Sequence, residues 1–349
     1  MKVSKEELTR LIVNKLRKAG FSEEHAAEIA EVLVYADARG YHSHGAIRVE
    51  YYAERAVMGG INTRPQFSFE RTGPCTGIFH GDNAAGQVAA KRAMVKAVEI
   101  AKESGIACVG VRRISHSGAL GYFVQQAAEE GLIGISVCQA DPMVVPYGGS
   151  EPFYGTNPIA FSVKGDNGKF ITFDMATAVK SWGKILEARA NKREIPDTWA
   201  VDRHGNPTAD PYQVRGLLPA AGPKGFGLAM MVDILSGILL GLPFGRFVSP
   251  LYGDLTKNRD LGQLHLVVNP AFFTDAEAFR RNITRTMEEL NNMKPAGGFD
   301  RVAYPGQGSA ERAAESEKHG IEIADEVYEY LVSDAVHRGR YHHYDPFAD

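Results

Sequence analysis

Residues 106–138 read IACVGVRRISHSGALGYFVQQAAEEGLIGISVC, and this stretch decides the fold class. Two apolar runs of strand length, 106–111 and 132–138, flank a helical pattern over 118–130. Short continuous apolar runs are typical of strands that are buried on both faces of a sheet. The stretch therefore predicts a strand–helix–strand unit at the centre of an α/β protein.

The same alternation continues on both sides of this stretch. A helix is predicted over 86–104, after a short strand at 78–79. Two strand candidates at 158–163 and 169–173 flank a Gly-Asp-Asn-Gly turn, which is typical of a tight connection between antiparallel strands. A further strand is predicted over 263–268. We therefore expect a mixed sheet.

Helical patterns occupy both ends of the chain. Ser4 and Ser22 are N-cap candidates for two helices within the first forty residues. A third helix is predicted over 43–59. Two more helices, at about 275–291 and 322–336, are expected to close the chain, so that helical segments flank the α/β centre.

The composition excludes several classes of protein. The chain has 349 residues, of which 44% are hydrophobic, and its formal net charge is −3, as in ordinary soluble proteins. Lys and Arg are scattered, so no nucleic-acid partner is expected. The most apolar stretch, 227–242, contains Asp233 and is predicted to be a buried helix, so no membrane partner is expected. Three separated cysteines and a charged amino terminus without an apolar signal segment indicate a cytoplasmic location.

A polar cluster, YHSHG, opens the predicted third helix. On that helix His44, Arg48 and Tyr52 would lie at i, i+4 and i+8 and share one face. A planar guanidinium beside an imidazole and a phenol suits a carboxylate ligand. The alternative is that Arg48 pairs with an acid such as Glu31 or Asp37, and that the tyrosine only packs.

Two candidates for acid–base chemistry follow predicted strands. His116 lies between a strand and a helix, and ligands bind α/β sheets at the carboxyl ends of strands. Its ordinary pKa allows it to take up or release a proton near neutral pH. Asp141 follows the next strand, and adjacent strand ends would bring it close enough to orient the imidazole. The alternatives are a solvated or helix-capping histidine and an Asp-Pro turn.

His42 and His44 form an HxH pair, which some zinc hydrolases use. A zinc site needs three or four ligands, and the chain contains no HExxH sequence and no close cysteine pair. We therefore expect no metal, and a metal-dependent hydrolase remains a remote alternative.

The sequence contains no standard nucleotide-binding fingerprint. No GxGxxG follows a predicted strand and no GxxxxGK[ST] is present, which disfavours a Rossmann domain. Three other segments could approach a cofactor: 223–225 at a helix start, where free N–H groups attract anions, the loop 304–308, and 174–176 after a strand. Taken alone, each is equally an ordinary helix start, loop or strand end.

Six ordered segments resemble one family, the type-2 malate/L-lactate dehydrogenases, which lack a Rossmann domain. They are HSHGAIRVEYY (42–52), SHSGALGYF (115–123), TNPIAF (156–161), FDMATA (173–178), GPKGFGLAMMVDILSG (222–237) and PGQG (305–308). The match spans essentially the whole chain, and six motifs in order are far more specific than one. The segments VLVYADARG, VEYYAERA, SDAV and LSGILLGLPFGR resemble the branch of this family that oxidises ureidoglycolate.

The resemblance implies a mixed, largely antiparallel sheet with flanking helices, and a homodimer or higher oligomer with its site near the subunit interface. It implies proton transfer by His116, beside which Asp141 is the second catalytic candidate. The implied substrate contacts are Ser43, His44, Arg48, Tyr52 and Arg259. The implied cofactor contacts are Ala140, Asp174, Met175, Ala176, Lys224, Gly306 and Gln307. Ala140 departs from the pattern, because a serine is expected there, and its hydrogen bond would be lost.

Three parts are expected along the chain. Residues 1–72 would form a helical domain joined by the C-terminal helices of 309–349. Residues 73–220 would form the central α/β cofactor-binding domain, and 221–308 a third α/β segment that completes the cofactor site.

The expected activity is oxidation of (S)-ureidoglycolate, a small 2-hydroxy acid, to oxalurate. The cofactor would be NAD, with NADP possible because the acidic ribose signal belongs to a fingerprint that is absent here. The alternatives are a dehydrogenase of malate, lactate or sulfolactate, a cyclic-imine reductase, and a non-catalytic binding protein.

Overall fold

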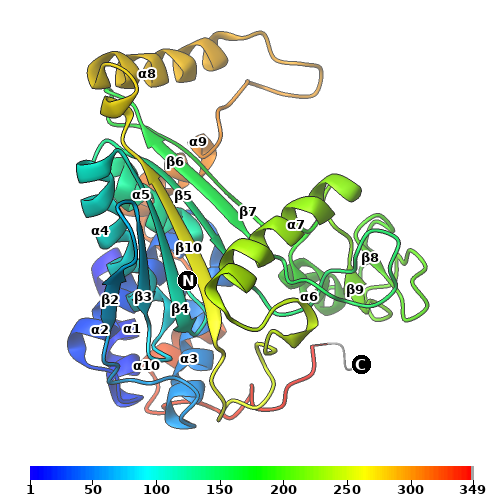
Figure 1. The fold of residues 1–349 in the computed structure, drawn as a ribbon. Helices are drawn as coiled ribbons and strands as arrows, with labels where there is room; N and C mark the ends of the chain where they lie inside the picture. The colour runs from blue at the N-terminus through cyan, green and yellow to red at the C-terminus, as the bar shows by residue number, and fades with distance from the viewer. Residues whose placement is uncertain (347–349) are drawn as a thin grey trace.

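A seven-stranded sheet forms the centre of the computed structural model, which describes residues 1–346. Its strands are β2 (Ser68–Arg71), β3 (Thr76–His80), β4 (Ile106–Ile114), β5 (Ile133–Cys138), β6 (Ile159–Lys164), β7 (Phe170–Met175) and β10 (Leu261–Val268). They lie in the order β2-β3-β4-β10-β5-β6-β7 (Figure 1). β3 and β4 are parallel, and the remaining neighbours are antiparallel. The expected α/β class with a mixed, largely antiparallel sheet is therefore confirmed.

Strand β10, from late in the chain, lies between β4 and β5. Leu264 pairs with Gly110 of β4 on one side and with Val137 of β5 on the other. The expectation that β4 and β5 are adjacent is therefore wrong. Because β10 is antiparallel to both, β4 and β5 still run in the same direction and end at the same edge of the sheet, as does β7.

Helices cover both faces of the sheet. α4 (Gly86–Ser104), with the predicted bounds, and α5 (Leu120–Glu129) pack on one face around buried residues such as Val109 and Phe123. α7 (Pro223–Ser236) packs on the other face through Val232. A Cβ on Gly110 would meet the Leu240 side chain at 2.3 Å, so glycine allows the turn after α7 to approach the sheet.

The two ends of the chain share a second hydrophobic core. Its helices are α1 (Lys5–Lys18), α2 (Glu23–Ala38), α3 (Val49–Val57) and α10 (Asp325–Val332). The short strands β1 (Lys2–Val3) and β11 (Ile321–Glu322) pair antiparallel beside them. Ser4 and Ser22 accept hydrogen bonds from the backbone of Glu7 and His25, which confirms both N-caps. The division of the chain into domains remains a prediction.

Helix α3 begins later than the sequence predicts. His42–His44 and Ala46–Arg48 form two 3-10 turns, and regular helix begins only at Val49. The prediction that His44 and Tyr52 share one continuous helical face is therefore wrong, because two separate turns precede the helix.

The buried carboxylate of Asp37 shapes these turns. It accepts hydrogen bonds from the backbone N–H of Ala46, at 2.6 Å, and from Nδ1 of His42, at 3.0 Å. A Cβ on Gly45 would lie 2.1 Å from this carboxyl group. The glycine therefore allows the chain to turn tightly around Asp37 before α3 begins.

A small lobe lies beside the sheet (Figure 1). It is formed by the residues between β5 and α7 that do not belong to the sheet strands β6 and β7. It contains α6 (Trp182–Ala190) and the strand pair β8 (Ala200–Val201) and β9 (Gly216–Leu217). Its own core contains Val144, Ile185 and Val214. The lobe places the loops 140–158 and 176–222 next to the sheet edge where β5 and β7 end.

Helix α7 is less buried than expected. Among residues 1–346, Pro223–Leu240 is the one helical stretch long and apolar enough to cross a membrane by length and composition, and 39% of it is buried inside the chain. Its inner face, with Val232 and Asp233, is buried as predicted. Its outer face exposes apolar side chains, namely Leu228, Met231, Ile234, Ile238 and Leu239. The predicted burial is therefore confirmed for the inner face of this helix, whereas its outer face is exposed.

The C-terminal third contains more structure than predicted. α8 (Ala276–Asn292) extends beyond the end of the sheet opposite to α3 (Figure 1). α9 (Gln307–His319) begins at the PGQG motif, and the two helices predicted near the end of the chain omit it. α10 ends at Val332, and the C-terminal tail, residues 333–346, contains no helix. The expected helical segment 309–349 is thus only partly helical, and 347–349 lie outside the described residues.

Candidate active site

Three predicted residues meet at the edge where β4 and β5 end. His116 follows β4, Asp141 follows β5, and Arg259 precedes β10, the strand between them. Nη2 of Arg259 lies 3.7 Å from Oδ1 of Asp141. The charge of Arg259 also contributes to lowering the pKa of His116. The strand that separates β4 from β5 thus brings a cation to the site.

His116 is a half-buried imidazole held by a phenol. The Tyr52 hydroxyl lies 2.7 Å from His116 Nδ1, and the two rings are stacked with centroids 6.1 Å apart. Burial lowers the pKa of His116 well below 6.5, and the positive charges of Arg48 and Arg259 lower it further. A histidine with this pKa is neutral at physiological pH and can accept a proton through its second nitrogen.

Arg48 faces the same imidazole and is held by two oxygens. Its Nε donates to the Ser43 carbonyl at 2.7 Å, and its Nη1 donates to the Tyr252 hydroxyl at 2.5 Å. Asp37 is engaged by the turn before α3. The alternative in which Arg48 pairs with Asp37 or Glu31 is therefore not what the structure shows.

Glu31 has other partners. It forms an ion pair with Lys91 and accepts a hydrogen bond from the Tyr122 hydroxyl at 2.6 Å. The guanidinium of Arg48 thus has no carboxylate among its hydrogen-bond partners in residues 1–346, as expected for a group that binds an anionic ligand.

His44 and Ser43 lie beside these groups. The His44 ring is 5.7 Å from the ring of His116, and burial lowers its pKa to about 4. The Ser43 hydroxyl lies 3.0 Å from His44 Nδ1. Both rings are thus neutral at physiological pH, so a negatively charged substrate meets the cations of the site without a competing imidazolium.

Arg259 is almost wholly buried, with 1% of its surface exposed. It donates through Nε and Nη2 to the hydroxyl and carbonyl of Ser249, at 3.0 and 2.7 Å. Its Nη1 is buried and has no hydrogen-bond partner in the part of the chain that the structure describes. A buried guanidinium nitrogen without a partner is costly unless a ligand completes it.

Asp174, at the end of β7, contacts the helix that follows His116. Its Oδ2 accepts a hydrogen bond from the backbone N–H of Gly121, in the first turn of α5, at 2.8 Å. Burial raises the pKa of Asp174 to about 6. The motifs SHSGALGYF and FDMATA are therefore brought together by this contact.

The start of α7 lies beside the end of β7. Ala220 N donates to the Thr177 carbonyl at 2.8 Å, which joins the FDMATA segment to the loop before Pro223. Met175 is 41% exposed, and Lys224 is exposed in the first turn of the helix. An apolar side chain thus lies near a helix N-terminus, where the free N–H groups and a lysine favour anions.

Gly306 and Gln307 approach the middle of β7. Gly306 has φ +89°, and a Cβ there would meet the Thr172 carbonyl oxygen at 2.5 Å. The Pro305 carbonyl accepts a hydrogen bond from Thr172 N at 3.0 Å. The PGQG loop thus lies alongside the strand that carries Asp174.

Ala140 contributes its backbone to the site edge. Its N–H donates to Oδ1 of Asn157, at 3.1 Å, and Asn157 donates to the Ala229 carbonyl of α7, at 3.0 Å. A Cβ on Gly155 would lie 2.2 Å from the Ala140 carbonyl oxygen. Ala140 therefore lies where β5, the TNPIAF segment and α7 meet, with a methyl group in place of the expected hydroxyl.

Tyr252, which holds Arg48, is not among the site residues predicted from the sequence. The residue lies in an irregular segment between α7 and β10, and no periodic pattern links it to α3. Its only sequence signal is a tyrosine in a loop that also contains Gly253 and Asp254. Among residues 1–346, no group of three or more His, Cys, Asp or Glu side chains is placed to hold a metal ion.

The half-buried, neutral imidazole of His116 lies close to two guanidinium groups, an arrangement suited to proton transfer from a small anionic substrate. A family model described as malate/L-lactate dehydrogenase matches residues 3–332. The chain is similar to "Ureidoglycolate dehydrogenase (NAD(+))" of Escherichia coli (strain K12), with 59% identity over 100% of each chain. It is also similar to L-sulfolactate dehydrogenase of Methanocaldococcus jannaschii, with 39% identity over 92% of this chain and 93% of the relative.

Solved structures agree with these sequence relatives. The sulfolactate dehydrogenase structure from Methanocaldococcus jannaschii superposes with a TM-score of 0.89 at 37% identity, and covers 95% of each chain. The malate dehydrogenase structure from Pyrococcus horikoshii OT3 gives 0.86 at 35% identity, over 95% of this chain and 93% of that one. The chain belongs to the malate/L-lactate dehydrogenase family and is therefore a dehydrogenase.

Proposed function

We propose that this chain oxidises (S)-ureidoglycolate to oxalurate with NAD, a step in allantoin breakdown. The observation that carries the chemistry is the neutral imidazole of His116, bonded to Tyr52 and close to Arg48 and Arg259. The substrate follows from the relatives that are 59% identical over their full length. The 39% identical relative that acts on sulfolactate makes another 2-hydroxy acid the second candidate.

Two arginines bind the substrate in this proposal, and His116 transfers the proton. Arg48 binds the substrate carboxylate, and the unpartnered Nη1 of Arg259 donates to a second oxygen of the substrate. Nδ1–H of His116 donates to the Tyr52 oxygen, so that the lone pair of Nε2 accepts the proton of the substrate hydroxyl. A bound nicotinamide would supply the acceptor for the hydride that leaves the carbinol carbon. The products are the 2-oxo acid, the reduced cofactor and one proton, which His116 releases.

Tyr52 acts on His116 in this proposal rather than on the substrate directly. Burial raises the pKa of the Tyr52 hydroxyl, so it stays protonated. A protonated phenol can accept from Nδ1–H in both protonation states of His116 and thereby keeps Nε2 directed at the substrate. Asp141, which lies 3.7 Å from Arg259, orients that guanidinium or binds the ureido end.

The residues around β7 fit a dinucleotide. The exposed Met175 offers an apolar surface for a ring, and the start of α7 with Lys224 offers N–H groups and a positive charge for phosphates. Asp174, Ala176, Ala140, Gly306 and Gln307 complete the proposed set. NAD is the cofactor named for the 59% identical relatives, whereas a 31% identical relative is named for NADP.

The function is tested by an assay of nicotinamide absorbance with a panel of 2-hydroxy acids. We expect ureidoglycolate with NAD to give the highest kcat/KM, above malate, lactate and sulfolactate. Activity should persist after treatment with a chelator, because the proposed mechanism uses no metal. A higher kcat/KM for another acid would assign the chain to that substrate, and absence of turnover with every acid would overturn the proposal.

The pH dependence of the reaction should report the lowered pKa of His116. The base acts when neutral, so kcat/KM for oxidation should stay level from pH 8 down to pH 6.5 and fall only at lower pH, where His116 becomes protonated. Replacing Arg48 by Ala removes one positive charge that lowers this pKa. The acid limb of the profile should then move to higher pH, and a limb that moves to lower pH would contradict the assignment.

We further propose a cytoplasmic homodimer or higher oligomer. The exposed apolar face of α7 carries Leu228, Met231 and Ile234, and faces of this kind mark protein interfaces. The start of this helix lies at the proposed cofactor site, which places that site near the interface. Met231→Glu should shift the mass measured by light scattering towards the monomer, whereas Arg285→Glu on α8 should not. An unchanged mass for the first variant would exclude this face.

A further inference from the structure

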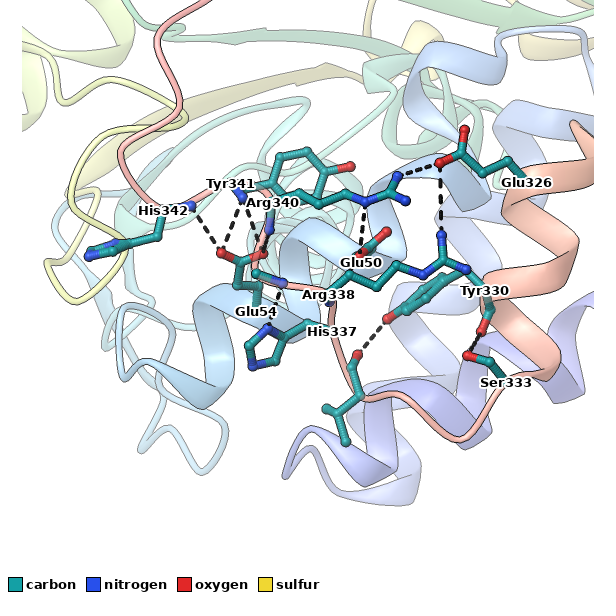
Figure 2. A network of polar contacts seen from close by, with 12 residues as sticks. Glu50, Glu54, Glu326, Tyr330, Ser333, His337, Arg338, Arg340, Tyr341 and His342 are labelled. Carbon is teal, nitrogen blue, oxygen red and sulfur yellow. Dashed lines mark hydrogen bonds and ion pairs between the residues drawn. The ribbon is translucent and has the colours of Figure 1, made fainter.

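The C-terminal tail, residues 333–346, is held against α3, the helix that carries Tyr52 (Figure 2). Its beginning is anchored by the buried Lys15, which donates to the carbonyls of Ser333, at 2.6 Å, and Ala335, at 2.5 Å. Glu50 of α3, which is 5% exposed, accepts from the backbone N–H of Arg338 at 2.9 Å. The tail is therefore a fixed part of the structure rather than a loose end.

Glu54 makes the most specific contact with this tail. Its side chain is fully buried and accepts hydrogen bonds from three successive backbone N–H groups (Figure 2). The distances are 2.9 Å from Arg340, 3.1 and 3.2 Å from Tyr341, and 2.9 Å from His342. A buried carboxylate that is bonded to three amides is well compensated, so it fixes both the position and the direction of these residues.

The residues that Glu54 fixes hold the loop that contains Tyr252. The Tyr341 ring stacks on the Tyr252 ring, with centroids 5.5 Å apart and planes at 17°. His342 Nδ1 accepts from Leu255 N at 3.2 Å, and His343 N donates to the Gly253 carbonyl at 3.1 Å. The tail thus holds the loop 252–255 at the ring of Tyr252 and at two residues that follow it, Gly253 and Leu255.

Tyr252 in turn holds Arg48. Its hydroxyl accepts the hydrogen bond from Nη1 at 2.5 Å, and the second bond to this guanidinium is the one between Nε and the Ser43 carbonyl. An arginine side chain has several rotatable bonds, so its affinity for a carboxylate depends on how well it is preorganised. The contact from Tyr252 removes part of that freedom.

We propose that the C-terminal tail positions the substrate-binding arginine, through Glu54, Tyr341 and Tyr252. These three are positioning residues for Arg48, and the proposal rests on the function assigned above to that arginine. Arg338 of the tail lies 288 positions after Glu50 of α3, so a segment distant in sequence sets the affinity of the site for its hydroxy acid.

The test is a comparison of KM with kcat in Tyr252→Phe and Tyr341→Ala. Tyr252→Phe removes only the hydroxyl, and Tyr341→Ala removes the stacked ring. Each should raise KM for the hydroxy acid by roughly five- to tenfold, the effect of one lost hydrogen bond or aromatic pair. We expect kcat within about twofold and KM for NAD unchanged, because binding is lost equally in ground state and transition state.

Conservative and matched variants separate positioning from folding. Tyr341→Phe keeps the stacked ring and should restore the wild-type KM. Tyr330→Phe removes a hydroxyl that donates to the Val336 carbonyl of the same tail, at 2.6 Å, and should leave KM unchanged. The double variant Tyr252→Phe/Tyr341→Ala should raise KM little beyond either single variant, because both act through the same contact. If Tyr341→Ala does not fold, the KM of Tyr252→Phe alone tests the positioning role.

Arg48→Ala distinguishes the two ways in which this proposal can fail. If Arg48→Ala raises KM for the hydroxy acid but Tyr252→Phe and Tyr341→Ala do not, the positioning role is overturned while the proposed function stands. If Arg48→Ala leaves that KM unchanged, the role of Arg48 in the proposed function fails, and the positioning role fails with it.

Discussion

Replacing His116 by Ala should lower kcat for oxidation of the hydroxy acid by roughly 10² to 10⁴-fold, the usual contribution of a general base. The structure gives the reason, because the other rings near the site do not offer a second base at the same place. Tyr52 stays protonated because burial raises its pKa. The ring of His44 is 5.7 Å from that of His116, too far to take its place. Binding of NADH, measured by fluorescence, should be nearly unchanged, since the role proposed for His116 is contact with the substrate hydroxyl rather than with the cofactor.

Two variants make this result specific. His319→Ala replaces an exposed histidine on α9 and should keep wild-type kcat. Tyr52→Phe keeps the imidazole but loses the hydroxyl that is bonded to Nδ1, so its loss of kcat should be smaller than that of His116→Ala. Retention of most of the turnover by a folded His116→Ala variant would remove this residue from the proton-transfer role.

Replacing Arg48 by Ala should lower kcat/KM for the hydroxy acid by roughly 10²-fold, which corresponds to about 3 kcal/mol for a lost charged hydrogen bond. Most of the loss should appear in KM, because the carboxylate carries its charge in both the ground state and the transition state. The guanidinium has no protein carboxylate as a hydrogen-bond partner among the described residues, so its removal leaves no buried acid unpaired. The measurement is steady-state kinetics at saturating NAD.

Arg48→Lys is the matched control for charge. Lysine keeps the positive charge but loses the planar fork and the donor to Tyr252, so it should recover only part of kcat/KM. Guanidinium added to the Arg48→Ala reaction should recover activity in a concentration-dependent way. A wild-type KM in Arg48→Ala would show that another group, such as Arg259, binds the carboxylate.

The sequence predicts those parts of the fold that have local signals. Helix α4 has the predicted bounds because apolar residues at helical spacing end at Gly105, which adopts φ +82°. The place of β10 between β4 and β5 has no such signal. Its paired residues are 125 to 162 positions apart, and the pairing depends on which strand edges remain open after the rest of the sheet forms. No local pattern in a single sequence indicates this.

The structure brings several of the candidate site residues together, but in a geometry that the sequence did not predict. Spacing placed His44, Arg48 and Tyr52 together through a continuous helix, whereas Asp37 divides this segment into turns. His116 was found from its place after a strand, which depends only on local pattern. The contact from Tyr252 to Arg48 joins residues 204 positions apart, so no local pattern could reveal it.

The late position of β10 in the chain also bears on how the protein is made. A ribosome must release residues 261–268 before the strand between β4 and β5 exists, and until then both neighbours expose open edges. The hydrophobic core at the amino terminus likewise cannot be completed until α10 and the tail have been synthesised. Nascent chains halted before residue 260 should therefore be protease-sensitive and prone to aggregate, and native structure should form only after synthesis is nearly complete.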